Sequence, residues 1–224
     1  ANGALGVDAV LRAPKAHHTF LVASDSVSLL PLFRQTPWDL TRSFTPVAVL
    51  SVQPVVVVTS AASGLKSIQH LLGELFAQGL GLNLLHIPYK GGGQAVNDVV
   101  AGQVTVAVLG AAAVLPHIKS GKLGALAVST RQRSPMLPDA PTLAESGAGD
   151  IDVPQWSALF AVAGTPAPVI ARLRRAVDES LAEPAVAQKL ASLAMETVNT
   201  TPDAFQQRML QDRGQMFTTL AEIR

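Results

Sequence analysis

The sequence predicts an α/β protein in which short β-strands alternate with helices. Runs of four to seven residues rich in Val, Leu and Thr alternate with segments whose apolar residues recur at helical spacing. Hydrophobic residues make up 48% of the 224 residues and charged residues only 15%, as in a chain that buries a core. The strand pattern stops after residue 163 and the remainder reads as helical. We therefore expect parallel strands joined by crossover helices, followed by a helical tail.

Seven short segments rich in β-branched or aliphatic residues are expected to form the strands. In chain order they are 19–23, 47–52, 55–59, 84–87, 104–109, 123–128 and 157–163. Helices are expected at 65–76 after a Ser63 N-cap, and at 91–101, 111–119, 169–181, 185–193 and 203–223. Three prolines within 131–141 predict a loop, and Pro141 then suits the start of a short helix ending at Gly147.

Charge and composition exclude several classes of protein. Seventeen Lys and Arg balance sixteen Asp and Glu without clustering, so no nucleic-acid partner is expected. The absence of cysteine excludes disulfides and thiolate metal sites. The longest apolar stretches, 47–58 and 104–116, fall short of the ~20 residues that span a bilayer. The chain starts at Ala1 without a basic and apolar leader, which we interpret as a processed product or a start downstream of an export signal.

Sequence motifs for catalysis and cofactor binding are absent. The five histidines include no i,i+4 pair with a nearby Glu, so no metal site is predicted. Neither GxGxxG after a strand nor GxSxG occurs, and we predict no catalytic residues and no cofactor. Trp38 and Trp156 are expected to be buried against aliphatic neighbours rather than to stack on a ligand.

The strongest local feature is a glycine-rich turn between an expected strand and an expected helix. Residues 87–95 read IPYKGGGQA, and the candidate ligand-binding residues in this segment are Lys90, Gly91, Gly92, Gly93 and Ala95. Glycines let the backbone approach a ligand closely, and the N–H groups that begin a helix suit an anion such as a carboxylate. The alternative is a tight turn without a ligand, with Lys90 simply exposed.

Small polar residues form a second candidate at the end of the first expected strand. Ser24, Asp25 and Ser26 lie where open α/β sheets collect their ligands. Capping of the following helix is the alternative interpretation.

Five segments together resemble a known family of transport proteins. They are TPWDLTRSFTPVAVL, HIPYKGGGQAVNDVVAGQV, AAAVLPHIKSGKLGALAVST, RSPMLPDAPTLAESG and WSALFAVAGTPAPVIARL. In this order they resemble the Bug-type solute receptors of tripartite tricarboxylate transporters, and the resemblance runs over about residues 3–217.

The resemblance implies a two-lobed periplasmic binding protein of the type II-like class, with a ligand cleft between the lobes. It implies that residues 1–59 form the N-terminal part of lobe 1, that 60–128 form lobe 2, and that 129–224 return to lobe 1 with the C-terminal helices. Ser67, Leu109, Gly110 and Ala111 join the two candidate sets above as residues lining that cleft. The implied ligand is a small organic carboxylate, namely a di- or tricarboxylate, an aromatic acid or an amino acid. The implied partners are the membrane permease subunits, and a periplasmic monomer is expected.

Two departures from the family pattern stand out. The family opens with a strand and a glycine-rich loop that precede the first residues here, and the segment between 59 and 67 is shorter than usual. We interpret both as omitted stretches rather than deletions, because losing two strands would expose sheet edges. Two alternatives stay open: a ligand-sensing domain of a regulatory system, and an enzyme whose base would be Asp25, His70 or Lys90 without an orienting partner. The sequence does not indicate which carboxylate is bound.

Overall fold

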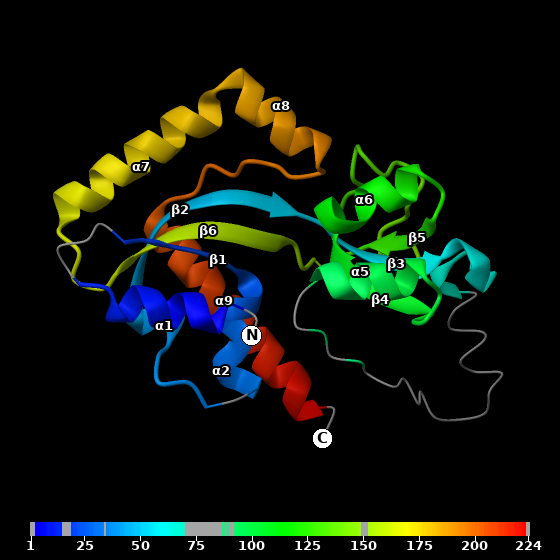
Figure 1. Cartoon of the computed structure of the whole chain (residues 1–224), viewed down its shortest axis with the longest axis horizontal. Coiled ribbons are helices and arrows are strands. Elements are labelled where there is room, and N and C mark those ends of the chain that lie inside the picture. Colours follow the sequence, from blue (N-terminus) through cyan, green and yellow to red (C-terminus); the bar gives the residue numbers. More distant parts are fainter. Residues whose placement is uncertain are drawn as a thin grey trace. The chain divides into compact units, whose positions relative to one another are not determined.

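The chain folds into two compact units, each with its own sheet (Figure 1). The computed structural model describes residues 3–14, 19–33, 35–69, 87, 89, 92–148 and 152–222. Unit 1 comprises Ala1–Val52, Trp156–Lys189 and Glu196–Arg224, and unit 2 comprises Gln53–Gln155 and Leu190–Met195. None of the described helices is long and apolar enough to cross a membrane.

The sheet of unit 1 has the strand order β1-β6-β2. These strands are β1 Leu21–Ser24, β2 Phe44–Gln53 and β6 Gln155–Val162. Strand β1 pairs antiparallel with β6, with Leu21 opposite Phe160 and Ser24 opposite Ser157. The helices that begin in this unit are α1 Ala4–Arg12, α2 Asp25–Phe33, α3 Leu40–Ser43, α7 Ala167–Ala182, α8 Pro184–Ser192 and α9 Pro202–Glu222.

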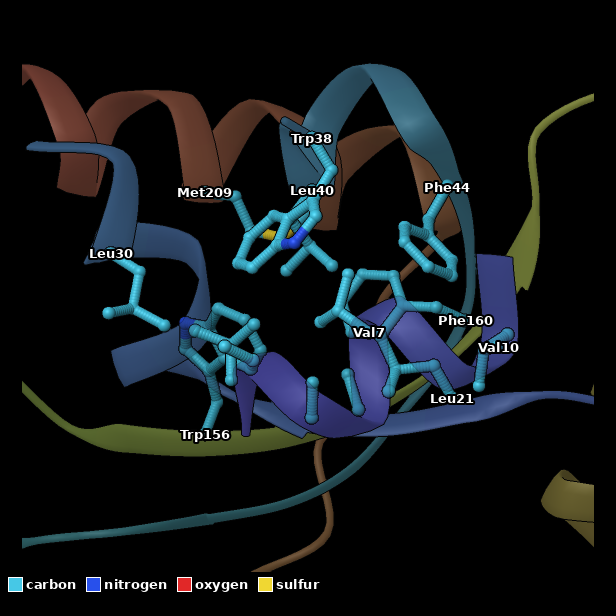
Figure 2. Packing of buried hydrophobic residues seen from close by; sticks show 14 of the residues in the cluster. Val7, Val10, Leu21, Leu30, Trp38, Leu40, Phe44, Trp156, Phe160 and Met209 are labelled. Carbon is cyan, nitrogen blue, oxygen red and sulfur yellow. The ribbon is translucent and has the colours of Figure 1, made fainter. Parts of the chain in front are cut away.

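The core of unit 1 forms because α1, α9 and the sheet each present an apolar face to one another. On α1, Val7 and Val10 are three residues apart and both are buried, as helical spacing requires. Figure 2 shows them near Leu21 and Phe160 of the sheet, with Met209 of α9 among the same group of side chains. The hydrophobic effect therefore holds segments from both ends of the chain in one unit.

Both tryptophans are buried in this core, as the sequence predicts, but their indole N–H groups differ. Trp38 Nε1 donates a hydrogen bond to Asp8 Oδ1 at 3.0 Å. The Trp156 ring packs edge-on against Phe205, with ring centroids 4.9 Å apart. Within the described part of the chain, no acceptor contacts Trp156 Nε1, which leaves a buried donor without a partner.

An ion pair ties the last helix of unit 1 to the start of α3. Asp39 caps α3 by accepting a hydrogen bond from Thr41 N at 2.9 Å, and Arg213 Nη1 of α9 lies 2.7 Å from Asp39 Oδ2. Burial by itself raises the pKa of Asp39, but the hydrogen bonds from Thr41 and Arg213 outweigh burial and lower it below its usual value. The folded state therefore favours the ionised carboxylate.

Unit 2 is built around a central strand that pairs on both sides. Strand β3 Val55–Ser60 lies between β4 Val106–Gly110 and β5 Leu123–Val128. Helices α5 Gly92–Val100 and α6 Ala111–Lys119 pack on this sheet, and the short 3-10 helix η1 Ala61–Ser63 follows β3. The core of the unit gathers Val56 and Val58 of β3, Val96 and Val99 of α5 and Val114 of α6.

The expectation of parallel strands is wrong for the pairings β1–β6, β3–β4 and β3–β5, all of which are antiparallel. In unit 2 the reason is the place of β3. Because β4 and β5 both run opposite to β3, they are parallel to each other, and α6 joins them as a crossover helix should. The alternation of strand and helix is thus a correct prediction. It does not reveal, however, that β3 lies between β4 and β5 in the sheet.

Most predicted elements are confirmed to within about three residues at each end, and α6 and β5 have the predicted ends. The expected short helix before Gly147 is a single turn: Ser146 N donates to Thr142 O at 3.0 Å, and Gly147 ends the turn with φ 73°. A reciprocal pair of hydrogen bonds between Thr142 and Glu145 caps this turn. Residues 84–86 of the strand predicted at 84–87 and most of the helix predicted at 65–76 lie outside the described residues, and the described Ile87 is not in a strand.

Candidate ligand-binding site

The glycine-rich turn leads directly into α5, whose first two residues are Gly92 and Gly93. Neither glycine has a positive φ, so the backbone conformation does not require them. A Cβ atom at Gly92 would have only ordinary contact with Leu109 Cδ2 at 3.9 Å, and at Gly93 it would meet nothing within 4 Å. Among the described residues, packing therefore does not require these glycines either, and only Leu109 lies near a Cβ built at either position. Lys90 and Gly91 lie outside the described residues.

Tyr89 links the segment before this turn to the body of α5. Its hydroxyl donates a hydrogen bond to Asp98 Oδ2 at 2.7 Å. That hydrogen bond, together with partial desolvation and the charge of Asp98, raises the pKa of Tyr89 above its usual value. Ala95 lies on the buried face of α5, so only its backbone could contribute to a ligand site. Nothing in the sequence predicts the Tyr89–Asp98 contact beyond the closeness of the two residues along the chain.

The turn between β4 and α6 carries three candidate residues, Leu109, Gly110 and Ala111. It borders the start of α5, because Leu109 is the nearest side chain to a Cβ built at Gly92. Ala111 N donates to Pro54 O at 3.0 Å, and the next backbone N–H, that of Ala112, donates to Gln53 Oε1 at 2.8 Å. The first two N–H donors of α6 therefore already have acceptors within the protein.

The serine-rich candidate set lies in unit 1, where β1 ends and α2 begins. Ser24 Oγ and Ser26 Oγ are 2.9 Å apart, and Ser26 N donates to Asp25 Oδ1 at 2.8 Å. Ser28 Oγ donates to the Asp25 carbonyl at 2.7 Å. These local bonds are those of a capped helix start, so the polar side chains have partners within the set. Ser67, the remaining candidate, precedes the buried Ile68 in unit 2.

The structure thus brings together two of the candidate segments, the start of α5 and the β4–α6 turn, both within unit 2. Among the described residues, no group of three or more His, Asp or Glu side chains could hold a metal ion. Of the three candidate bases, His70 and Lys90 lie outside the described residues, and Asp25 accepts a hydrogen bond from Ser26 N.

Comparison with solved structures places this fold among periplasmic binding proteins. The periplasmic binding protein BugD is 27% identical in sequence and superimposes with a TM-score of 0.86, over 99% of this chain and 83% of that one. MatC from Rhodopseudomonas palustris, solved with bound malate, is 24% identical with a TM-score of 0.85, over 96% of this chain and 83% of that one. The mixed α/β fold is therefore that of a periplasmic binding protein.

Sequence comparison then shows the family. Residues 61–222 match the family described as tripartite tricarboxylate transporter family receptor. Protein BugT of Bordetella pertussis is 33% identical over 230 residues, covering 91% of this chain and 71% of the relative. The chain belongs to the tripartite tricarboxylate transporter receptor family, as its resemblance to Bug-type receptors predicts.

Proposed function

We propose that this protein is a periplasmic receptor that binds a small organic carboxylate and delivers it to the membrane permease of a tripartite tricarboxylate transporter. The observation that carries the proposal is the start of α5, where neither the packing of the described residues nor the backbone conformation requires Gly92 and Gly93. Membership in a family of receptors supports binding rather than catalysis. Malate, which is bound to MatC, is the natural first ligand to test.

The physical basis is the N-terminus of α5. The first N–H groups of a helix have no acceptor within it, and the aligned peptide dipoles place about half a positive charge there. A carboxylate can accept two of these N–H groups, and each charge-assisted hydrogen bond contributes ~1.5–3 kcal/mol. The side chain of Leu109 borders this position and would exclude water on one side. Backbone groups, rather than side-chain charges, would then dominate binding.

The α6 start and the serine-rich set contribute differently in this proposal. The first donors of α6 have protein acceptors, so the β4–α6 turn supplies shape through Leu109 rather than hydrogen bonds through Ala111. Ser24 and Ser26 stay candidate ligand-binding residues of unit 1, and their hydroxyl groups bond each other. Lys90 lies outside the described residues, and an ion pair with the ligand in water would add ~0–1 kcal/mol.

The decisive experiment compares Gly92→Asp with the neutral variant Gly92→Asn. The two side chains have nearly the same shape, and a Cβ at residue 92 makes only ordinary contact with Leu109, so both variants should fold. Only the aspartate places a negative charge where the carboxylate binds. We expect isothermal titration with malate to show at least a hundredfold loss of affinity for Gly92→Asp, corresponding to two lost hydrogen bonds. The loss for Gly92→Asn should be much smaller.

A panel of carboxylates should precede the titration. Thermal unfolding in the presence of malate, tricarboxylates, aromatic acids and amino acids identifies the ligand class, because a ligand at 100 times its Kd adds about 2.7 kcal/mol of stability.

Near-normal affinity in a folded Gly92→Asp variant would move the site away from α5. Lys90→Ala provides a second comparison, since a greater loss there would make the lysine the principal anchor. Uptake into vesicles carrying the permease, dependent on added receptor, would test delivery.

A further inference from the structure

Two glutamines far apart in sequence meet beside the β4–α6 turn. Gln53 is the last residue of β2 and Gln155 is the first residue of β6. Gln53 Nε2 donates a hydrogen bond to Gln155 Oε1 at 2.8 Å, and both side chains are half-buried. Both residues belong to unit 2. This contact, which we call the amide pair, joins the segment that enters the unit to the segment that leaves it.

A backbone N–H fixes the orientation of the amide pair. Ala112 N, in the first turn of α6, donates to Gln53 Oε1 at 2.8 Å. Because a backbone N–H can only donate, the oxygen of the Gln53 amide must face α6 and the nitrogen must face Gln155. The Gln53 amide therefore caps the start of α6 through its oxygen and holds Gln155 through its nitrogen. Neither role is available to an apolar side chain.

The amide pair also explains why residue 110 is a glycine. Gly110 has φ −60° and ψ 138°, a conformation that any residue adopts. A Cβ built there would lie 2.3 Å from Gln155 Oε1 and 2.8 Å from Gln53 Nε2, both too close for real contacts. The two amides thus pack directly on the backbone of the turn between β4 and α6, in the space a side chain would need.

We infer that Gln53 and Gln155 are positioning residues for the carboxylate site: they hold the β4–α6 turn beside Gly92 and occupy the α6 donor at Ala112. This inference rests on the proposed function, in which that turn borders the ligand. With Pro54 O accepting from Ala111 N, the first two donors of α6 are withheld from an incoming carboxylate. In the proposal the anion therefore binds the N–H groups at the start of α5, and the β4–α6 turn contacts it only through the side chain of Leu109.

Three variants and one control test the positioning role. Gln155→Met removes the acceptor of Gln53 Nε2 at nearly constant volume. Gly110→Ala pushes the two amides apart without changing either, and this is tolerable because the displaced atoms are the ends of flexible side chains. Gln155→Glu keeps an oxygen acceptor for Gln53 and serves as the rescue. Gln132→Met makes the same substitution at an exposed loop position of the same unit and is the matched control.

The first readout is hydrogen exchange of the Ala112 amide, measured by NMR without ligand. We expect exchange at least tenfold faster in Gln155→Met and Gly110→Ala than in the wild type, and wild-type exchange in Gln132→Met and Gln155→Glu. The second readout is malate affinity, which should fall about five- to tenfold in the first two variants, the effect of one hydrogen bond.

If the wild type binds a carboxylate, either of two results would overturn the inference. Unchanged Ala112 exchange in Gln155→Met and Gly110→Ala would mean that the amide pair does not hold the turn. Faster exchange with unchanged malate affinity would mean that the turn is held but does not position the site. If the wild type binds no carboxylate of the panel, the proposed function fails and the positioning role fails with it. The exchange data then still decide whether the amide pair holds the turn.

Discussion

Replacing each buried tryptophan by phenylalanine should destabilise the protein unequally, because only one indole N–H has a hydrogen-bond partner among the described residues. Trp38 is 5% exposed and Trp156 is 4% exposed, and both lie in the core of unit 1. The two substitutions remove the same atoms from similarly buried positions, so the loss of packing largely cancels in the comparison. The remaining difference in stability comes from the two indole N–H groups. Trp38 Nε1 donates a hydrogen bond to Asp8 Oδ1, whereas Trp156 Nε1 has no partner among the described residues.

The magnitude follows from these two terms. A hydrogen bond to a charged group contributes ~1.5–3 kcal/mol, and Trp38→Phe loses it. A buried donor without an acceptor costs ~1–3 kcal/mol, and Trp156→Phe removes that cost. Both terms have the same sign in the comparison, so Trp38→Phe should be less stable than Trp156→Phe by at least ~2 kcal/mol.

Urea denaturation followed by circular dichroism gives the free energy of unfolding of each variant. Both substitutions lie in unit 1, so separate unfolding of the two units does not confound their difference. An equal loss of stability, or a greater loss for Trp156→Phe, would refute the reasoning. It would mean that the Trp156 N–H has an acceptor in solution or that the Asp8 contact contributes nothing.

Two further predictions concern titratable groups. Because the folded state lowers the pKa of Asp39, the stability that its bonds to Arg213 and Thr41 contribute is complete above the unfolded pKa of about 4 and is lost as pH falls through the folded pKa. The stability advantage of the wild type over Asp39→Asn should therefore be full at neutral pH and shrink below about pH 4 in acid denaturation, and a constant difference would contradict the assignment. Tyr89 is the single tyrosine of the chain, so its tyrosinate absorbance should titrate above pH 10, and the midpoint should fall in Asp98→Asn; an unchanged midpoint would argue against the hydrogen bond between them.

Local sequence signals predicted the elements well where each end of an element is marked along the chain. Helix α6 follows a strand at Gly110 and is succeeded by Gly121, whose φ of 71° suits the residue beyond a helix end. Strand direction was not predictable in the same way, because β3 joins its neighbours through pairings that only the folded chain creates. The single turn at residues 142–147 was overestimated as a helix because Pro141 marks where helical structure can start, not how far it extends.

The candidate site shows the same division between local and long-range information. The glycines at 92 and 93 were recognisable from the sequence, but only the structure shows that neither conformation nor packing demands them. Gln53 and Gln155 gave no signal at all, because they are 102 positions apart and each stands at a strand end. The occupied donors of α6 likewise depend on acceptors from β2 and from Pro54, which the motif around Gly110 does not contain.

The central claim, that the start of α5 holds the carboxylate, is tested most directly by following the backbone amides of Gly93 and Gln94 by NMR during titration with the tightest-binding acid of the panel. Amide protons that begin to donate to a carboxylate move downfield and exchange more slowly with solvent. We predict both changes at Gly93 and Gln94, with the Ala112 amide unchanged because it already donates to Gln53. Saturating binding that leaves the two α5 amides unshifted while amides elsewhere respond would contradict the account.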